Sequence, residues 1–527
     1  MKNNNDGLVQ IGSSSGVSRR SFLKVLGASA AAGVAGCADD HTQHVLPYVK
    51  GENEQIPGVS VWYKSTCSEC SAGCGILVRT REGRAVKVEG DPDSPINKGG
   101  LCALGQSSLQ GLYDPDRVRE PIARERGSDA SGRTVYSFKH LSWDSALAKV
   151  APAIKGSDKK RALITGELSG AQSELVSKFC QGMGFEHYTW DPMQPTALRS
   201  ATEEVFGVAG IPTFKIDAAD IVLNFGADFL ETWISPVEYA RGWADSRRGE
   251  HKCKFVHVEP RLSLSGANAD LWLSCKPGSE IELLKYIVRE LITSGRGSSL
   301  PRDVYSAVLS FVKGATLETV SLKTGIETEK VALLLQSLRE ARAPLVIAGG
   351  TAASVNGGLA IQLLVAVLNS VLGAVGKTVD LVNIRTCETS IEKISELLAG
   401  MKNGDYETVI VSGTNPAFTL PSSFGFAQAR NMVPNFIALS SQLDETAELA
   451  TYVLPVHASL ESWGDVRVRT GVYSLQQPTM RPVFDSKSFG DVLIGLTKSA
   501  GNAELFSATP TFESFLKESW KSIHSAA

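Results

Sequence analysis

Hydrophobic residues along the chain gather in short runs, which longer amphipathic segments separate. Runs of this kind occupy residues 161–165, 221–224, 255–258, 345–348, 408–411 and 435–439. Apolar runs separated by helix-length segments are typical of parallel strands joined by crossover helices. The pattern therefore predicts an α/β fold with two doubly wound parallel-sheet domains, at residues 140–340 and 341–486.

Two of the expected strands end in similar turns. The run at 221–224 leads into Gly-Ala-Asp at 226–228, and the run at 408–411 leads into Gly-Thr-Asn at 413–415. Phosphate or nucleotide ligands approach such turns in open α/β sheets, because glycine lets the backbone come close. Any tight strand-to-helix turn would use the same residues, so the pattern alone establishes no ligand site. Its repetition predicts two related domains that meet near residue 340.

Helical spacing is clearest at residues 142–154, where apolar positions recur every three or four residues after a serine and an early acidic residue. A longer apolar stretch, 359–376, contains the polar residues Gln362 and Asn369. Polar interruptions of this kind favour a buried crossover helix over a membrane span. Residues 487–527 are predicted to form a C-terminal helical tail.

Before these domains, residues 76–90 alternate between apolar and polar on both sides of Glu82 and Gly83. Alternation around such a pair is typical of a β-hairpin. We therefore expect a small β-rich domain at residues 60–120.

Four cysteines fall within this small domain. Cys67, Cys70 and Cys74 have C-x2-C-x3-C spacing, and Cys102 follows after 27 further residues. Iron–sulfur cubanes take four thiolates, and glycines around the third and fourth cysteines allow the backbone to wrap closely. Zinc sites more often use two C-x2-C pairs or mixed Cys/His sets. Disulfides are a further alternative, since they are the usual state of cysteines in exported proteins. The three-residue step argues against zinc, and the spacing predicts one [4Fe–4S] cluster.

The other candidate ligands are scattered. We expect four widely separated cysteines to be buried free thiols: Cys180, Cys253, Cys275 and Cys387. We expect three histidines to be satisfied by local partners rather than to act as catalysts or ligands: His140, His257 and His457.

The N-terminus has the pattern of an export signal. Arg19 and Arg20 stand in the string SRRSFLK, and a short run of small apolar residues follows to residue 36. Paired arginines in this setting mark the twin-arginine route, which carries proteins already folded; an amphipathic helix with two chance arginines is the alternative. Residues 34–37, which end in Cys37, resemble the cleavage motif of a bacterial lipoprotein. The alternative is ordinary signal-peptidase cleavage, in which Cys37 is removed or stays an unmodified thiol. Residues 1–36 are thus predicted to be a twin-arginine signal, and Cys37 the lipidation site of a protein anchored on the periplasmic side of the cytoplasmic membrane.

The composition of the chain excludes several classes of protein. The chain has 527 residues, 43% of them hydrophobic, with 49 glycines and 22 prolines, which excludes a disordered or collagen-like protein. The length exceeds one compact domain. With 53 basic and 56 acidic side chains, the formal net charge is −3, so no basic field exists to attract nucleic acid.

Taken together, these motifs make the chain similar to the molybdopterin-guanine-dinucleotide oxidoreductase superfamily. Besides the cysteine spacing, the resemblance rests on LSWDSAL at 141–147, VEPR at 258–261, ADLWL at 269–273, KPGSE at 276–280, GTNP at 413–416 and ATYVLP at 450–455. Within the superfamily, residues 101–115 and 460–465 most resemble the large molybdopterin-like subunit of alternative complex III and, next, of menaquinone reductase complexes.

The resemblance implies an iron–sulfur subunit of a membrane-associated respiratory quinone oxidoreductase complex. Its partners would be a ferredoxin-like iron–sulfur subunit, a multihaem cytochrome and a quinone-binding integral membrane subunit. Cys67, Cys70, Cys74 and Cys102 would hold the [4Fe–4S] cluster, which would transfer electrons while the fold serves as a scaffold.

Three departures from the catalytic members argue against a molybdenum site and its molybdopterin guanine dinucleotide. No Cys, Ser or selenocysteine stands at residues 190–196, where the family's metal ligand would fall, although Asp191 could serve, as aspartate does in some members. Leu104 stands where those members carry Lys or Arg, and it cannot donate a hydrogen bond to a pterin. The chain stops at Ala527, so we expect the family's C-terminal cofactor domain to be absent.

Two alternatives remain open at this point. The first is a catalytic molybdenum or tungsten enzyme with an unusual metal ligand, such as a polysulfide or sulfur-oxyanion reductase. The second is a purely structural subunit whose cluster only stabilises the N-terminal domain. Glu461, Trp463 and Asp465 could line a former cofactor cleft, but capping and turn roles explain them equally well.

Overall fold

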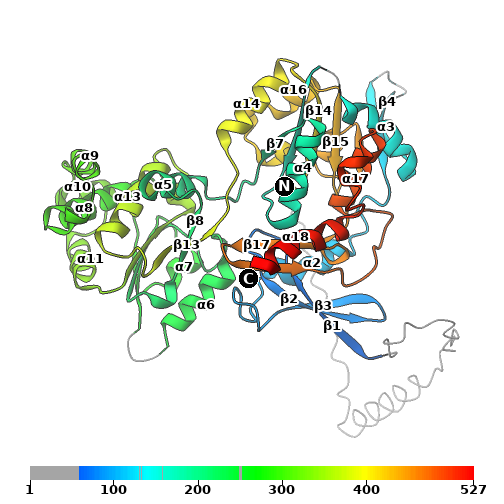
Figure 1. Ribbon diagram of the computed structural model, residues 1–527. Coiled ribbons are helices and arrows are strands. Elements are labelled where there is room, and N and C mark those ends of the chain that lie inside the picture. The colour runs from blue at the N-terminus through cyan, green and yellow to red at the C-terminus, as the bar shows by residue number, and fades with distance from the viewer. Residues whose placement is uncertain (1–57, 130, 132, 157, 249–251, 527) are drawn as a thin grey trace, which may run out of the picture. The chain divides into compact units, whose positions relative to one another are not determined.

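The structure is a computed structural model that describes residues 58–526 apart from 130, 132, 157 and 249–251 (Figure 1). These residues belong to one compact unit, Pro57–Ala527. The expected export signal and Cys37 lie outside the described residues. Among the described helices, none combines the length and apolar character that a membrane crossing requires.

The N-terminal part is a three-stranded antiparallel sheet followed by a helix. The strands pair in the order β1 (Ser60–Thr66), β2 (Gly75–Arg81), β3 (Arg84–Gly90), and α2 (Ala103–Leu112) follows. The β2–β3 hairpin turns at Glu82 and Gly83, which confirms the predicted hairpin. The first long loop, between β1 and β2, carries three of the four cysteines.

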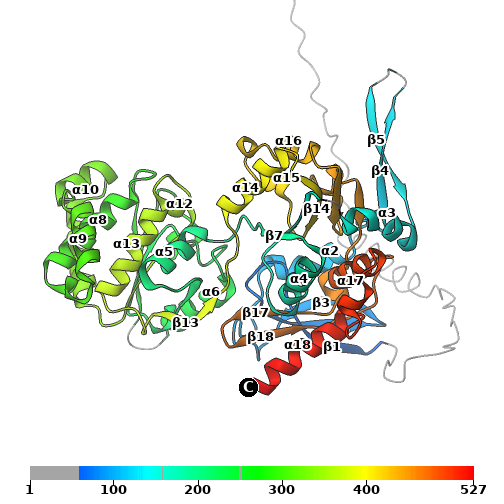
Figure 2. The same cartoon turned by 45° about the horizontal axis from the view of Figure 1, so that its top comes forward.

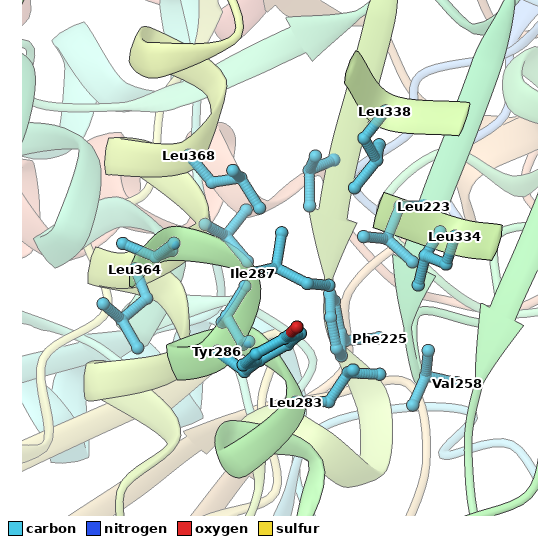
Figure 3. Close-up of a cluster of buried hydrophobic side chains, with 14 of the residues drawn as sticks. Leu223, Phe225, Val258, Leu283, Tyr286, Ile287, Leu334, Leu338, Leu364 and Leu368 are labelled. Atoms are coloured by element: carbon cyan, nitrogen blue, oxygen red, sulfur yellow. The ribbon is translucent and has the colours of Figure 1, made fainter. Parts of the chain in front are cut away.

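A four-stranded, fully parallel sheet forms the centre of one α/β domain. Its order is β11 (Leu271–Leu273), β10 (Lys254–Val258), β9 (Ile221–Phe225), β12 (Pro344–Ala348). One face packs against α8 (Glu280–Thr293), α11 (Thr328–Glu340) and α13 (Gly358–Val371), whose leucines and isoleucines interdigitate with Leu223, Phe225 and Val258 (Figure 3). Burial of these apolar side chains is the main stabilising term.

Further elements complete this domain. The other face of the sheet packs against an aromatic cluster that includes Phe229, Tyr239 and Phe255. A small antiparallel pair, β8 (Ile211–Phe214) and β13 (Val379–Arg385), flanks it. The remaining helices are α5 (Thr196–Phe206), α6 (Pro236–Ser246), α7 (Leu264–Ala267), α9 (Arg302–Val312), α10 (Leu317–Thr324) and α12 (Gly350–Ala353).

A seven-stranded sheet forms the centre of the other α/β domain. Its order is β5 (Thr134–His140), β4 (Ile122–Ser128), β16 (Tyr452–Leu454), β15 (Asn435–Leu439), β14 (Tyr406–Ser412), β6 (Lys160–Thr165), β7 (Glu186–Thr189). Its last five strands are parallel, whereas β4 and β5 form an antiparallel ribbon at one edge (Figure 2).

Helices cover this sheet, and a second hairpin lies beyond it. The helices are α3 (Trp143–Lys155), α4 (Gly170–Met183), α14 (Ile391–Lys402), α15 (Pro416–Thr419), α16 (Phe426–Asn431), α17 (Phe489–Ser499) and α18 (Phe512–Ala526). The hairpin is β17 (Gly464–Arg469) with β18 (Val472–Gln476).

Both helices predicted from sequence pattern are present. In α3 the Ser142 hydroxyl accepts a hydrogen bond from Ser145 N, which satisfies one of the free amides at the helix start. In α13 the two polar residues are buried but paired: Gln362 donates to Ala348 O, and the Asn369 amide exchanges two hydrogen bonds with the Val346 backbone. Each therefore ties the crossover helix to strand β12.

The expected division of the two α/β domains at residue 340 is wrong. Strand β12 pairs with β9, so residues 344–348 complete the earlier sheet, and β6 pairs with β14, so residues 160–165 belong to the later one. The chain leaves the seven-stranded sheet after β7, builds the four-stranded domain, and returns at β14. Apolar runs predict which residues form strands, but their pairing depends on contacts distant in sequence.

The predicted C-terminal tail is helical but is not a separate part. Val492, Leu493 and Leu496 of α17 are fully buried in the core that α3 and α4 share with the seven-stranded sheet. Residues 487–526 therefore belong to that domain.

Candidate metal centre

The fold brings the four predicted cysteines together. Cys67 and Cys74 lie at the two ends of the β1–β2 loop, where Cys67 N donates to Cys74 O at 2.8 Å, and both are buried. Cys70, between them, is exposed. Cys102 is half-buried at the residue that precedes the first turn of α2. Three of the predicted ligands therefore lie on one loop, and the fourth lies at the start of a helix.

Electrostatics connects the four sulfur atoms. Burial raises the pKa of the Cys67 thiol and of the Cys74 thiol to about 12, and charges on the other cysteines of the set add to both shifts. The guanidinium of Arg385 opposes the burial-driven rise in pKa at Cys70 and Cys74. Iron ions bound at this site would reverse these preferences, because a coordinating thiol loses its proton.

The loop is shaped for close packing. Gly73 has a φ of +65°, and a Cβ built there would lie 2.7 Å from Val468 Cγ2 on β17, so a side chain at this position would disturb the loop. Four thiols, three of them on one tight loop, fit a [4Fe–4S] cluster. Within the described part of the chain, no three Cys, His, Asp or Glu side chains form a group suited to one metal ion.

Sequence reasoning missed Asn97, which joins the two halves of the cysteine set. Its side chain is fully buried; it accepts from Gly75 N and donates to Gly75 O and to Gly100 O, at 2.7–2.9 Å. The amide thereby fixes the residue after Cys74 against the segment that precedes Cys102. A buried asparagine before a Gly-Gly pair carries no distinctive pattern, so only the fold identifies its role.

The first position where a phosphate could bind is the N-terminus of α4, after strand β6. Free amides there attract anions. Asp465 takes this place: its carboxylate accepts from Ala171 N at 2.9 Å and from Trp520 Nε1 of α18 at 2.9 Å, and it is buried. Gly170 lies directly under it, with a φ of +61° and a built Cβ only 2.6 Å from the carboxylate. A phosphate would have to displace this carboxylate.

The second position is the turn after β9, which the sequence marked as a possible nucleotide site. Two buried carboxylates occupy it: Asp228 accepts from the Ser265 backbone and hydroxyl, and Glu259 interacts with His257 and Arg261. Like charge repels phosphate at close range. At both positions, therefore, buried carboxylates lie where a phosphate would approach.

Other candidates have structural roles. Glu461 forms a fully buried ion pair with Arg117 at 2.8 Å, and Trp463 packs against the core of the seven-stranded domain. The Asp191 carboxylate accepts from Met193 N and Gln194 Nε2 within its own turn. The Leu104 side chain is exposed.

The remaining cysteines behave as predicted, and so do the histidines except His257, whose Nδ1 is buried without a hydrogen-bond partner. His140 pairs with Glu120 at the surface, His257 lies against Glu259, and His457 bonds the Ser486 hydroxyl. Burial lowers the pKa of His257 and of His457, so neither favours the charged form. The four scattered cysteines are buried and free: Cys180, Cys253, Cys275 and Cys387.

A four-cysteine β-domain joined to two α/β domains, one with a parallel sheet and one with a mainly parallel sheet, is the architecture of an iron–sulfur oxidoreductase. Residues 60–114 match the model of the molybdopterin oxidoreductase Fe4S4 domain, and residues 117–498 match that of molybdopterin oxidoreductase. The chain belongs to the molybdopterin oxidoreductase family. The first match supports a [4Fe–4S] cluster, and the second is compatible with a molybdopterin cofactor.

Named relatives agree with this assignment. The chain is 30% identical over 531 residues to the menaquinone reductase molybdopterin-binding-like subunit of Nitratidesulfovibrio vulgaris (strain Hildenborough), covering 95% of this chain and 74% of that protein. It is 29% identical over 335 residues to the arsenate respiratory reductase molybdopterin-containing subunit ArrA of Shewanella sp. (strain ANA-3), covering 60% of this chain and 37% of that one. The fold resembles acetylene hydratase from Pelobacter acetylenicus, with a TM-score of 0.69 at 13% identity, covering 85% of this chain and 70% of that chain.

Proposed function

We propose that this chain is an iron–sulfur subunit of a respiratory quinone oxidoreductase complex and has no molybdenum site of its own. Cys67, Cys70, Cys74 and Cys102 would hold one [4Fe–4S] cluster, which supplies one-electron transfer when bound. The surrounding domains would position that cluster between redox partners.

The observation that carries the proposal is the position of Asp465. The four cysteines form a complete donor set, whereas at the N-terminus of α4, where a phosphate could bind, the Ala171 amide already donates to this carboxylate, which Trp520 also holds. At the other turn, the buried carboxylates of Asp228 and Glu259 share one cation, Arg261, and so leave one net negative charge. The chain thus favours a cluster and opposes a pterin dinucleotide.

Complex membership rests on the relative from Nitratidesulfovibrio vulgaris, whose name places it in a menaquinone reductase. By analogy, the partners would be a ferredoxin-like iron–sulfur subunit, a multihaem cytochrome and a quinone-binding integral membrane subunit. Export by the twin-arginine route and lipidation at Cys37 would place the subunit on the periplasmic side of the membrane. The absence of the family's C-terminal cofactor domain stays a prediction.

Metal analysis of the purified full chain tests this proposal. We expect about four irons per chain, with molybdenum, tungsten and pterin below stoichiometric amounts. A stoichiometric molybdenum or tungsten content would overturn the proposal. A cluster that cannot be reversibly reduced would contradict electron transfer and leave a structural cluster.

A second candidate is a catalytic molybdenum or tungsten enzyme. The similarity to the ArrA subunit, which its name describes as molybdopterin-containing, favours this candidate. It requires Asp465 to leave the α4 N-terminus, so Asp465→Asn should then raise pterin content. Under the proposed function, Asp465→Asn leaves the chain free of pterin and only lowers its stability.

A further inference from the structure

Arg385 is a buried cation beside the cysteine loop. It ends strand β13, its side chain is 7% exposed, and Nη1 donates to Ala72 O at 3.3 Å and to Val468 O at 3.4 Å. Ala72 lies between Cys70 and Cys74, so the guanidinium contacts the segment that carries two of the four ligands.

A single carboxylate holds this arginine and a second one. Glu238 of α6 accepts from Arg385 Nη2 at 2.6 Å through Oε2, and from Arg469 Nη1 of β17 through Oε1. Their side chains are 7–16% exposed. Two guanidinium groups and one carboxylate leave one net positive charge, shielded from water, next to the loop. The group joins β13, α6 and β17 around the cysteines.

A purely structural role explains the hydrogen bonds but not the charge imbalance. Binding the loop carbonyl and β17 needs only donors, and a buried uncompensated charge costs free energy unless a negative partner lies close by. A four-thiolate cluster is anionic and gains one more negative charge when it accepts one electron. The triad therefore complements the reduced cluster better than the oxidised one.

We propose that Arg385 is a positioning residue that favours the reduced state of the [4Fe–4S] cluster, and that Glu238 limits this effect. The inference rests on the proposed function, because it needs the cluster at Cys67, Cys70, Cys74 and Cys102. One electron arrives from a reduced iron–sulfur or haem partner, no bond forms or breaks, and the added charge stays within reach of the guanidinium.

Redox titration of the full chain with dithionite, followed by electron paramagnetic resonance, tests this. Arg385→Gln removes a positive charge and should lower the reduced-to-oxidised ratio at a fixed potential about tenfold, equivalent to about 59 mV for one electron. Glu238→Gln removes the countercharge and should shift the ratio in the opposite direction. Arg385→Lys keeps the charge and should shift it least.

Arg430→Gln is the matched control, because Arg430 also binds backbone carbonyls from a half-buried position, but in the seven-stranded domain. It should leave the ratio unchanged. If Arg385→Gln does not retain its iron, the comparison of Glu238→Gln with wild type still tests the inference, because Glu238→Gln should raise the reduced-to-oxidised ratio. Shifts of one sign in both variants, or no shift in Glu238→Gln, would overturn the inference. A wild-type chain with no reducible cluster would instead overturn the proposed function.

Discussion

The cysteine-bearing domain and the four-stranded domain are held together by different means. The first has a small core in which Cys67 and Cys74 are themselves members. The second has a much larger core of aliphatic side chains on β9, β10, α8, α11 and α13. Because stabilisation grows with buried apolar area, the small domain depends more on individual polar contacts.

Those polar contacts come from distant parts of the chain. Ser65 Oγ donates to Gln477 O and Thr66 Oγ1 to Leu475 O, while Asn97 and Arg385 hold the loop from other sides. A site built in this way is specified by geometry and charge, whereas the sheet core tolerates changes that conserve volume. The contrast can be tested by single substitutions on each side.

The largest expected effect is loss of the cluster. Cys67→Ala removes one of four ligands, so we expect the bound iron and visible absorption to disappear. Hydrogen exchange should then rise across residues 60–114 while β9–β12 stay protected. Cys253→Ala is the control, since Cys253 is a buried free thiol in the four-stranded domain. Iron retained by Cys67→Ala would contradict the assigned ligand set.

The next effect concerns the buried pair of Arg117 and Glu461, whose side chains are 1% and 0% exposed. Glu461→Gln leaves Arg117 charged and uncompensated, which should lower the free energy of unfolding by about 3–5 kcal/mol. Denaturant titration measures it. Removing the arginine charge as well, as in Arg117→Met with Glu461→Gln, should recover much of the loss, because the Gln amide oxygen still accepts a hydrogen bond from Ala458 N or Val483 N. A double variant as unstable as the single variant would argue that the charge is not the cause.

Shortening a buried side chain in the core of the four-stranded domain should lower the free energy of unfolding without changing the properties of the cluster. Ile287 of α8 is fully buried under β9 and β10 (Figure 3). Ile287→Ala should lower the unfolding free energy by about 2–5 kcal/mol through lost contacts and a cavity, with iron content and midpoint potential unchanged. Leu322→Ala, at an exposed position of α10, serves as the control. A changed potential in Ile287→Ala would break the proposed independence of the two regions.

A pH effect should arise at Glu167, after strand β6. Burial raises the pKa of this carboxyl to about 7, with Glu388 and Asp191 adding repulsion, although Glu388 N and the Thr389 hydroxyl donate to it. The folded state therefore binds this proton more tightly than the unfolded state does. Its contribution to stability is complete below about pH 4.5 and is lost as pH rises through 7, by at most about 1.4 kcal/mol per pH unit.

Glu167→Gln should remove that part of the pH dependence. Unfolding free energies of the variant and wild type, compared at pH 5 and pH 7.5, should diverge at the higher pH, where Gln is the more stable. Equal differences at both pH values would show that Glu167 titrates normally.

The sequence predicted which residues form strands and helices more reliably than it predicted which strands pair with each other. Apolar runs at 221–224 and 345–348 are strands because continuous burial requires such runs. That these two strands are neighbours follows from hydrogen bonds between residues more than 100 positions apart, such as the pairing of Val222 with Leu345. Local pattern carries no information on that choice.

The candidate site shows the same limit. Cys67, Cys70, Cys74 and Cys102 are recognisable because cluster ligands need a fixed local spacing. Arg385 and Glu238 are not, since an arginine at the end of one strand and a glutamate in a helix look ordinary until the fold places them together. Asp465 similarly has the sequence context of a turn residue, and only its contact with Ala171 N shows that it lies at the N-terminus of α4.

The smallest expected effect compares two arginine–carboxylate pairs. Arg247 and Asp270 form a bidentate pair at 2.8 and 2.9 Å beside β10, but each side chain is 34% exposed. Water and salt screen such a pair, so Arg247→Gln should lower the unfolding free energy by no more than about 1 kcal/mol, and less at high ionic strength. Because water reaches the guanidinium and the sheet core beneath it is large, the stability of the four-stranded domain should depend little on this pair. A loss as large as that of Glu461→Gln would mean that the four-stranded domain also relies on single charged contacts, and the contrast between the two regions would fail.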